Sequence, residues 1–182
     1  MRVITGSARG RKLKEPQGRD VRPTTDQVKE AIFNICQFDV EGRAVLDLFG
    51  GTGQLGIEAA SRGAARVDVV DQSRAAVQLI RENVKLTGLA VQVHQAEALS
   101  YLRGCGKYGL IFLDPPYDSP LAVQALETIK AFDILSNGGI IICETRADCV
   151  LPALAAPYRK RKEYRYGKVK LTAYVREESE PE

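Results

Sequence analysis

Short apolar runs alternate with helix-like segments along the chain from residue 44 onward. The runs expected to form strands are apolar almost throughout and lie at 44–49, 67–70, 90–94, 110–113 and 139–144. The segments between them place apolar residues at helical spacing and lie at 55–63, 73–88, 97–103 and 121–135. Strands that are apolar on both sides are typical of sheets buried on both faces. The strict alternation therefore predicts a parallel sheet covered by helices on each face.

The two ends of the chain follow other patterns. Residues 158–177 carry two β-rich runs around Gly167, which predicts an antiparallel hairpin at one edge of the sheet. Residues 2–16 hold a glycine-bearing turn between two short extended runs, and a helix should begin after a cap at Thr25 or Asp26. The expected fold is α/β, a doubly wound and mostly parallel seven-stranded Rossmann-like sheet with a C-terminal hairpin and a small N-terminal hairpin and helix extension. We expect this extension at 1–40, the main domain at 41–176 and an acidic tail at 177–182.

Composition and cysteine spacing limit the class of protein that we expect. A chain of 182 residues with 45% hydrophobic content suits one good core. Four scattered cysteines without a CxxC pair suggest neither a disulfide framework nor a metal site. No segment approaches the ~20 apolar residues of a membrane span, and the first residues lack the apolar centre of a signal peptide, so we expect a soluble cytoplasmic protein.

The glycine-rich loop after the first expected strand, DLFGGTGQLGIEAA, formally satisfies GxGxxG at Gly51, Gly53 and Gly56. Glycines there allow positive φ and a close approach of the backbone to a ligand, while the next helix offers its N-terminal N–H groups. Asp71 follows Gly51 by twenty residues, where a carboxylate can accept hydrogen bonds from ribose hydroxyls. An NAD enzyme fits these features as well as other nucleotide-binding proteins do.

Asp47 changes that balance because it lies in the first strand just before the loop. A carboxylate there repels a pyrophosphate and attracts a cationic amine. S-adenosylmethionine carries such an amine and a sulfonium, and has no phosphate, so we expect it as the cofactor. Glu97, shortly after the third strand, is then a candidate contact for the adenine. The alternative is that the glycines are ordinary turn residues and that Asp71 caps the helix near Ser73.

The sequence LDPPY at 113–117 ends the fourth strand. Ligands of open parallel sheets bind at the carboxyl ends of the strands, so this corner should face the glycine loop. Pro115 and Pro116 make a stiff corner that holds the Asp114 carboxylate and a main-chain carbonyl in place. Two such acceptors can bind the hydrogens of an exocyclic base amine and stabilise the charge that develops as it attacks a methyl group. Tyr117 offers a ring on which the base can stack. The alternative is a rigid loop with an aspartate helix cap.

Four stretches together carry a family resemblance: RVITGSARGRKL, RPTTDQVKEAIFN, LDLFGGTGQLGIEAASRGA and LDPPY. Residues 1–176 resemble bacterial methyltransferases of the RsmD type, which methylate the exocyclic N2 of a guanine in small-subunit (16S) ribosomal RNA. The resemblance implies S-adenosylmethionine as methyl donor, residues 114–117 as the amine site and the segment 22–26 near the cofactor. Glu97 departs from the Asp or Asn usual in relatives of this fold. The expected catalytic residues are Asp114, Pro115, Pro116 and Tyr117, and the expected cofactor contacts are Arg22, Thr24, Thr25, Asp47, Gly50, Gly51, Gly53, Asp71, Gln72, Glu97 and Ala98.

The basic amino-terminal arm supplies the candidate RNA contacts. Residues 1–22 hold seven cations against two carboxylates, and Arg9, Arg11 and Lys12 cluster at a glycine turn. Because phosphate contacts give sequence-independent affinity, we expect these three side chains to bind RNA. The next candidates are the cations at 159–162, and the alternative for the arm is a merely solvated charged hairpin. The expected partner is ribosomal RNA, either free or within an assembling small ribosomal subunit.

Other interpretations stay open at this point. DPPY also serves adenine-N6 methyltransferases, GxGxxG also serves NAD-dependent oxidoreductases, and a non-catalytic RNA-binding module could retain the fold. His94, the only histidine, is a conceivable general base but fits better as a strand-end residue. Four tyrosines near the C-terminus could stack on bases, although sheet packing is favoured for most of them; they are Tyr158, Tyr164, Tyr166 and Tyr174.

Overall fold

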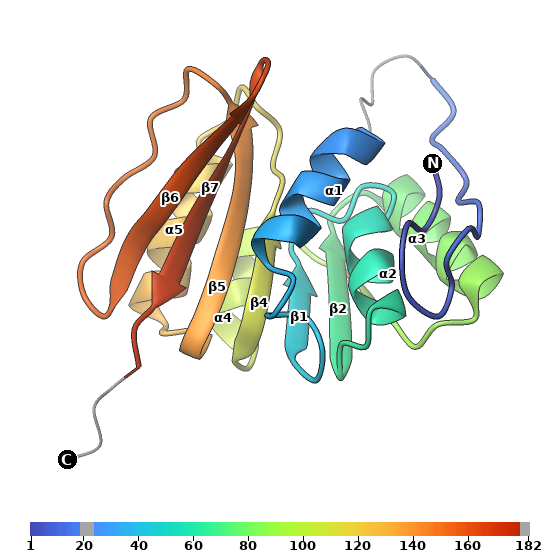
Figure 1. The fold of residues 1–182 in the computed structure, drawn as a ribbon, viewed down its shortest axis with the longest axis horizontal. Coiled ribbons are helices and arrows are strands. Elements are labelled where there is room, and N and C mark those ends of the chain that lie inside the picture. The colour runs from blue at the N-terminus through green and yellow to red at the C-terminus, as the bar shows by residue number, and fades with distance from the viewer. Residues whose placement is uncertain (19–23, 179–182) are drawn as a thin grey trace.

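The computed structural model describes residues 1–18 and 24–178 and contains a single seven-stranded sheet within them (Figure 1). The strand order is β3-β2-β1-β4-β5-β7-β6, with β1 to β5 parallel and β7 antiparallel to both β5 and β6. The strands are β1 (Ala44–Asp47), β2 (Arg66–Asp71), β3 (Gln92–Gln95), β4 (Tyr108–Leu113), β5 (Leu135–Arg146), β6 (Tyr158–Tyr166) and β7 (Val169–Arg176). The predicted doubly wound α/β fold with a C-terminal antiparallel pair is confirmed.

Helices cover both faces of the sheet. They are α1 (Asp26–Ile35), α2 (Gln54–Ser61), α3 (Arg74–Thr87), α4 (Ala98–Gly104) and α5 (Leu121–Ala131). One core cluster joins α1, α2 and α3 to the sheet, and the other joins α4 and α5 to its opposite face. Figure 1 shows α1 and α2 in front of the strands and α4 and α5 behind them.

The helix predicted at 121–135 ends earlier than the apolar pattern suggested. α5 stops at Ala131, because Asp133 adopts a left-handed conformation with φ of 48° and turns the chain back toward the sheet. Leu135 already belongs to β5, where it pairs with Tyr108 of β4. Apolar residues at the junction of a buried helix and a buried strand do not reveal where one ends and the other begins.

The N-terminal hairpin is held to the domain by polar contacts and by a small apolar cluster in which Val3, Ala8 and Leu13 pack against Ile57 of α2. It contains only one isolated bridge, between Arg2 and Lys12, rather than two regular strands. The Glu58 carboxylate on α2 accepts the N–H groups of Ile4 (2.8 Å) and Thr5 (2.9 Å). At Gly6, with φ of +88°, a Cβ would lie 1.8 Å from a backbone oxygen of α2, so only glycine fits this close approach. The hairpin therefore sits against α2 in a fixed position.

None of the helices in the described ranges is both long and apolar enough to cross a bilayer.

Candidate active site

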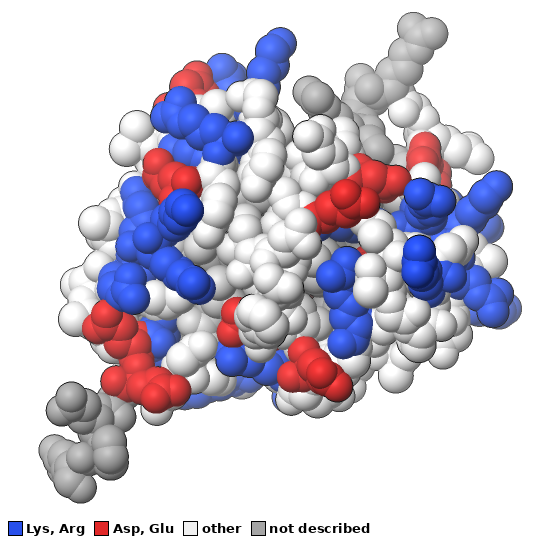
Figure 2. Space-filling model, in the orientation of Figure 1, with Lys and Arg blue, Asp and Glu red and all other residues white. Residues whose placement is uncertain are grey.

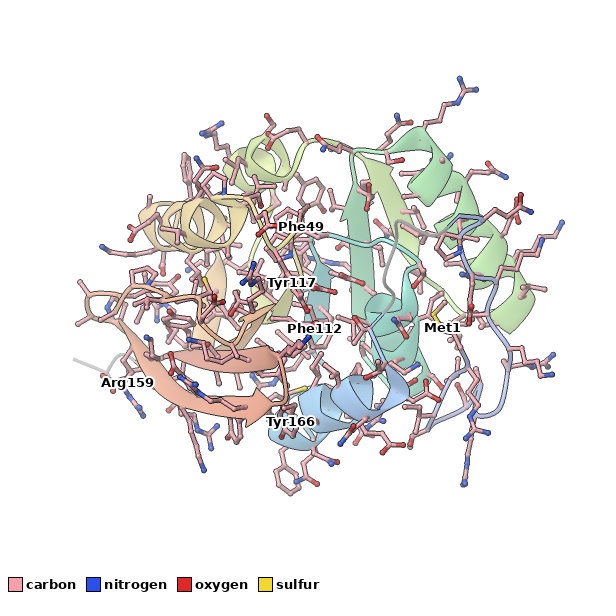
Figure 3. All side chains as sticks on the ribbon, turned by 90° about the horizontal axis from the view of Figure 1, so that it is seen from above. Met1, Phe49, Phe112, Tyr117, Arg159 and Tyr166 are labelled. Carbon is pink, nitrogen blue, oxygen red and sulfur yellow. The ribbon has the colours of Figure 1, made fainter. Side chains whose placement is uncertain are left out.

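A cavity of about 860 Å³ lies at the carboxyl ends of the parallel strands. This is the edge of the sheet where β1 and β4 lie side by side, so the glycine loop after β1 and the corner after β4 share one space. Figure 3 looks onto this end of the molecule, with Phe49 and Tyr117 near the centre and Tyr166 beside α1. The volume falls within the usual range for a bound cofactor or substrate. The lining residues used below are Thr24, Thr25, Asp47, Gly50, Gly51, Gln54, Asp71, Gln72, Glu97, Ala98, Asp114, Pro115, Pro116, Tyr117, Glu144, Tyr166 and Lys168.

The glycine loop brings bare backbone to the cavity wall. Gly51 has φ of +58°, and a Cβ there would meet nothing within 4 Å, so the loop leaves open space beside the backbone. Gly50 is required for packing instead, because its Cβ would lie 2.5 Å from a methyl group of Val69. Gly53 is not part of the cavity wall. With φ of 79° it is the residue from which α2 begins.

Asp71, at the end of β2, orients the loop. Its Oδ2 accepts the N–H of Gly51 at 2.9 Å, and its Oδ1 accepts the N–H of Ser73 at 2.8 Å. Ser73, not Asp71, caps α3, since its side chain accepts the N–H of Ala76. Asp71 and the adjoining Gln72 both line the cavity. A carboxylate oxygen accepts more than one hydrogen bond, so Asp71 can hold the loop and still accept from a ligand hydroxyl.

Asp47 is buried at the cavity wall, with 1% of its surface exposed. Its Oδ2 accepts the N–H of Gly56 at 3.0 Å, while no donor from the described residues reaches Oδ1. Burial raises the pKa of Asp47 to about 7, and the neighbouring Asp71 charge adds to the increase. A buried carboxylate with an unsatisfied oxygen favours a cationic or hydrogen-bonding ligand, because such a ligand offsets the desolvation of the charge.

Glu97 and Ala98 lie where the third strand leads into α4. Glu97 caps this helix: its carboxylate accepts the N–H groups of Leu99 (3.0 Å) and Ser100 (2.7 Å), which lowers its pKa. Both residues line the cavity. The Glu97 side chain thus has a structural role as the cap of α4. Its contact with adenine stays a prediction.

The corner after β4 places Asp114 on the cavity wall. Thr24 Oγ1 donates to Asp114 Oδ2 at 3.1 Å, which connects the segment before α1 to the corner. Burial raises the pKa of Asp114 well above its ordinary value, and the nearby Glu144 charge raises it further. The hydroxyl of Ser119 donates to the carbonyl of Pro116 at 2.7 Å and fixes the turn that follows. Asp114, Pro115 and Pro116 therefore stand together as predicted, opposite the glycine loop.

Glu144, on β5, is a site residue that the sequence analysis did not select. It is buried, lines the same cavity, and accepts a hydrogen bond of 2.7 Å from the hydroxyl of Tyr117. The sequence carried a signal for it, because Glu144 directly follows the apolar run at 140–143, as Asp71 and Asp114 directly follow theirs. Tyr117 thus joins the corner to the neighbouring strand, with 39% of its surface exposed.

The segment before α1 closes another side of the cavity. Thr25 caps α1 by accepting the N–H of Val28, and Thr24 accepts a hydrogen bond from the amide of Gln54 through its carbonyl at 3.1 Å. Thr24, Thr25 and Gln54 all line the cavity, and Gln54 was not predicted. Arg22, a predicted cofactor contact, lies outside the described residues.

Two further groups lie away from this cavity. His94 places Nε2 2.7 Å from Asp68 Oδ1, beside Tyr101 and outside the cavity wall, so it has no place in the site chemistry. Arg9, Arg11 and Lys12 are exposed on the N-terminal hairpin and do not line the cavity. Within residues 1–18 and 24–178, no group of three or more His, Cys, Asp or Glu side chains could hold a metal ion.

Comparison with known proteins decides the family. The model of the family described as "Conserved hypothetical protein 95" matches residues 1–175. The chain belongs to this family. Among family relatives, "Putative rRNA methyltransferase YlbH" of Bacillus subtilis is 37% identical over 96% of this chain and 98% of its own length. "Ribosomal RNA small subunit methyltransferase D" of Escherichia coli is 33% identical over 97% of this chain and 90% of its own length.

A solved structure of the same type agrees with the family assignment. The "Putative methyltransferase yhhF from Escherichia coli" superimposes with a TM-score of 0.88 at 32% identity, covering 98% of this chain and 99% of that one. The resemblance to RsmD-type methyltransferases is thereby confirmed, and the fold is that of Rossmann-like methyltransferases.

Proposed function

We propose that this family member transfers a methyl group from S-adenosylmethionine to the exocyclic N2 amine of a guanine in small-subunit ribosomal RNA. The observation that carries the proposal is the position of Asp114 and its proline corner across one cavity from the glycine loop. The Escherichia coli relative is named as a small-subunit ribosomal RNA methyltransferase, which supports the ribosomal RNA substrate.

The residues on the glycine-loop side suit S-adenosylmethionine. The unsatisfied Oδ1 of Asp47 favours its ammonium group, Asp71 can accept from the ribose hydroxyls, and the open backbone at Gly51 leaves room beside them. The donor supplies an electrophilic methyl group on a sulfonium. The buried Asp47 carboxylate beside the loop would repel a pyrophosphate, which disfavours an NAD-dependent oxidoreductase.

The corner residues act on the target amine. The Asp114 carboxylate and a main-chain carbonyl of the proline corner accept the two amine hydrogens, which favours a more tetrahedral and more nucleophilic nitrogen. As the nitrogen bonds to the methyl carbon, the carbon–sulfur bond of the donor would break with its electron pair left on the neutral thioether. The nitrogen becomes positively charged, and Asp114 or water takes its surplus proton. The Tyr117 ring supports the base by stacking, and its hydrogen bond to Glu144 fixes the ring position.

Glu144 favours guanine over the adenine-N6 alternative. Guanine presents N–H donors at both N1 and N2, whereas adenine presents a lone pair at N1. A second carboxylate close to Asp114 accepts the N1–H of guanine and repels the adenine lone pair. The carboxylates of Asp114 and Glu144 together therefore support a target base whose edge carries two adjacent N–H donors, as guanine does.

Nucleoside analysis of ribosomal RNA tests the proposal. Small-subunit RNA from cells lacking the protein should lack one N2-methylguanosine, and purified protein with S-adenosylmethionine should restore it. Protein with Asp114→Asn should bind the donor by calorimetry and restore the nucleoside about 10² to 10³ times more slowly than wild type. Loss of an N6-methyladenosine instead would establish the adenine alternative. Binding of RNA without binding of the donor would establish a non-catalytic module.

A further inference from the structure

The outer strand of the C-terminal hairpin presents cations and tyrosines on one face. In the antiparallel register, Lys162 lies opposite Ala173 and Tyr164 lies opposite Leu171. Ala173 and Leu171 belong to the core cluster on the α1 side of the sheet. Because directly paired residues project to the same face of a sheet, the paired β6 residues point to the α1 side too. We call this set the basic hairpin face; its members are Arg159, Lys162, Tyr164 and Tyr166.

The basic hairpin face leads into the active-site cavity. Its last member, Tyr166, lines the cavity together with Lys168 from the hairpin turn. From Arg159 to Tyr166 the strand spans about 23 Å at roughly 3.3 Å per residue. Figure 3 shows Arg159 at the outer end of this strand and Tyr166 at its inner end, beside α1.

Charge on this face is available to a partner. Arg159 is paired with Glu177 at 2.6 Å, but no carboxylate in the described part of the chain forms a salt bridge with the exposed Lys162. Lys162 Nζ instead lies 5.0 Å from the ring centre of Tyr164. Figure 2 shows Lys and Arg gathered over β6 and β7 on this side of the molecule. Cations beside half-exposed aromatic rings suit phosphates and unstacked bases together.

We infer that the basic hairpin face binds the single-stranded RNA that flanks the target nucleotide and guides it into the cavity. The inference rests on the proposed function, which requires an RNA whose target base leaves its stack. Extruding that base costs free energy, and contacts outside the cavity can offset the cost. Phosphates would lie against Lys162, and bases would stack on Tyr164 and Tyr166. The length of the strand matches a segment of about four nucleotides, the low end of single-strand binding sites.

The test compares two single substitutions on the same strand. Lys162→Gln removes a cation from the basic hairpin face. Arg165→Gln removes an equally exposed one from the opposite face, since Arg165 lies opposite Lys170 in the register. Among the described residues neither cation is engaged in a salt bridge, so both variants should fold. The probe is a fluorescent single-stranded RNA of about 16 nucleotides, titrated at several salt concentrations without S-adenosylmethionine.

Lys162→Gln should weaken binding about fivefold at about 0.1 M salt and flatten the dependence of log affinity on log salt by about 0.7. Arg165→Gln should match the wild type. Unchanged affinity and slope in Lys162→Gln would overturn the inference, and equal losses in both variants would show a general charge effect and overturn it as well. Normal RNA binding with impaired methylation of ribosomal particles would assign the face to a ribosomal protein instead.

Calorimetry of wild-type protein with S-adenosylmethionine keeps the two proposals apart. Failure of the donor to bind would overturn the proposed function, whereas the RNA titration of the two variants would still report on the basic hairpin face.

Discussion

At the scale of a single residue, the role proposed for Asp114 opposes the stability of the fold. Burial and the neighbouring Glu144 charge raise the pKa of Asp114, which means that the folded protein holds the ionised form at a cost. The proposed function entails this cost, because an ionised carboxylate accepts an amine hydrogen and stabilises the developing positive charge better than a neutral acceptor does. Under that proposal the site gives up stability for chemistry at this position.

Replacing Asp114 with Asn should lower turnover and raise stability. Turnover should fall by a factor of about 10² to 10³, since one charge-stabilising acceptor is weakened. The melting temperature at pH 8 should rise, because an acid with a raised folded-state pKa destabilises the fold above its ordinary pKa. Donor affinity, measured by calorimetry, should stay within about twofold of wild type. A larger loss of donor affinity would mean that Asp114 serves the cofactor.

Asp47 should impose a pH dependence on stability. Its pKa is raised to about 7 in the fold, whereas an unfolded aspartate titrates near 4, so between these values the native state holds a proton that the unfolded state has lost. Stability should therefore fall as the pH rises from about 4 to about 7, by up to about 4 kcal/mol. Asp47→Asn should remove this component while keeping an acceptor for Gly56. Urea unfolding at several pH values should show the variant's advantage growing with pH, and parallel curves would contradict the assignment.

At the scale of elements, the corner after β4 and strand β5 act as a pair through Tyr117 and Glu144. Tyr117→Phe keeps the ring and loses the hydrogen bond, whereas Tyr117→Ala loses both, so the loss in kcat/KM for RNA should be larger for Ala. Glu144→Gln combined with Tyr117→Phe should cost less than the sum of the two single losses, since they share one contact. Strict additivity would mean that the hydrogen bond does not position the ring.

The N-terminal hairpin depends on a buried ion cluster on α1 and α2. Lys29 and Glu58 have fully buried side chains, with Lys29 Nζ 3.7 Å from Glu58 Oε2, and Lys29 donates to the Arg2 carbonyl at 2.6 Å. Burial lowers the pKa of Lys29, and the Glu58 charge opposes that shift. Glu58→Gln leaves this lysine without its counter-charge and should cost about 3 kcal/mol of unfolding free energy. Chemical denaturation would measure the loss. Exposed Glu82→Gln is the control, because its pair with Lys14 lies at the surface.

The sequence pattern predicted most of the helices and strands and the location of the candidate site. Apolar strands that each end in a polar residue place Asp47, Asp71 and Asp114 at one edge of the sheet, and periodicity makes this visible. Side-chain partnerships were not visible in the same way. Nothing local shows that Thr24 donates to Asp114 or that Glu144 accepts from Tyr117, because each contact joins segments that meet only after folding. The cap that Glu97 provides to α4 is a local contact with Leu99 and Ser100, which the sequence analysis did not assign because it placed Glu97 at the cofactor.

At the scale of the whole molecule, two basic surfaces lie on either side of the cavity. Figure 1 shows the N-terminal hairpin over α2 and α3 at one end of the sheet and the C-terminal hairpin at the other. The predicted contacts Arg9, Arg11 and Lys12 belong to the first, and the basic hairpin face belongs to the second. An RNA that enters the cavity between them can touch both.

If both basic surfaces bind the same RNA, the changes in RNA binding caused by substitutions on each surface should add. Replacing Arg9, Arg11 and Lys12 with Ala should flatten the salt dependence by about 0.7 to 0.9 per lost phosphate contact. Adding Lys162→Gln should flatten it further by its own single-variant amount, because distant sites contribute independently. RNA titration of the three variants measures this. A combined variant no weaker than the arm variant alone would indicate that only one surface engages RNA at a time.

The anchoring of the N-terminal hairpin also determines when that arm takes shape during synthesis. Its first residues leave the ribosome early, yet the side chains that hold them come 53 to 69 positions later along the chain, at Glu58, Ser61 and Asn83. At roughly 5 to 20 residues per second, that gap lasts about 3 to 14 s. During this interval the hairpin is a cationic segment without its docking site, while the ribosome that makes it is itself built of polyanion. The hairpin can make all of these contacts only once Asn83 has been made.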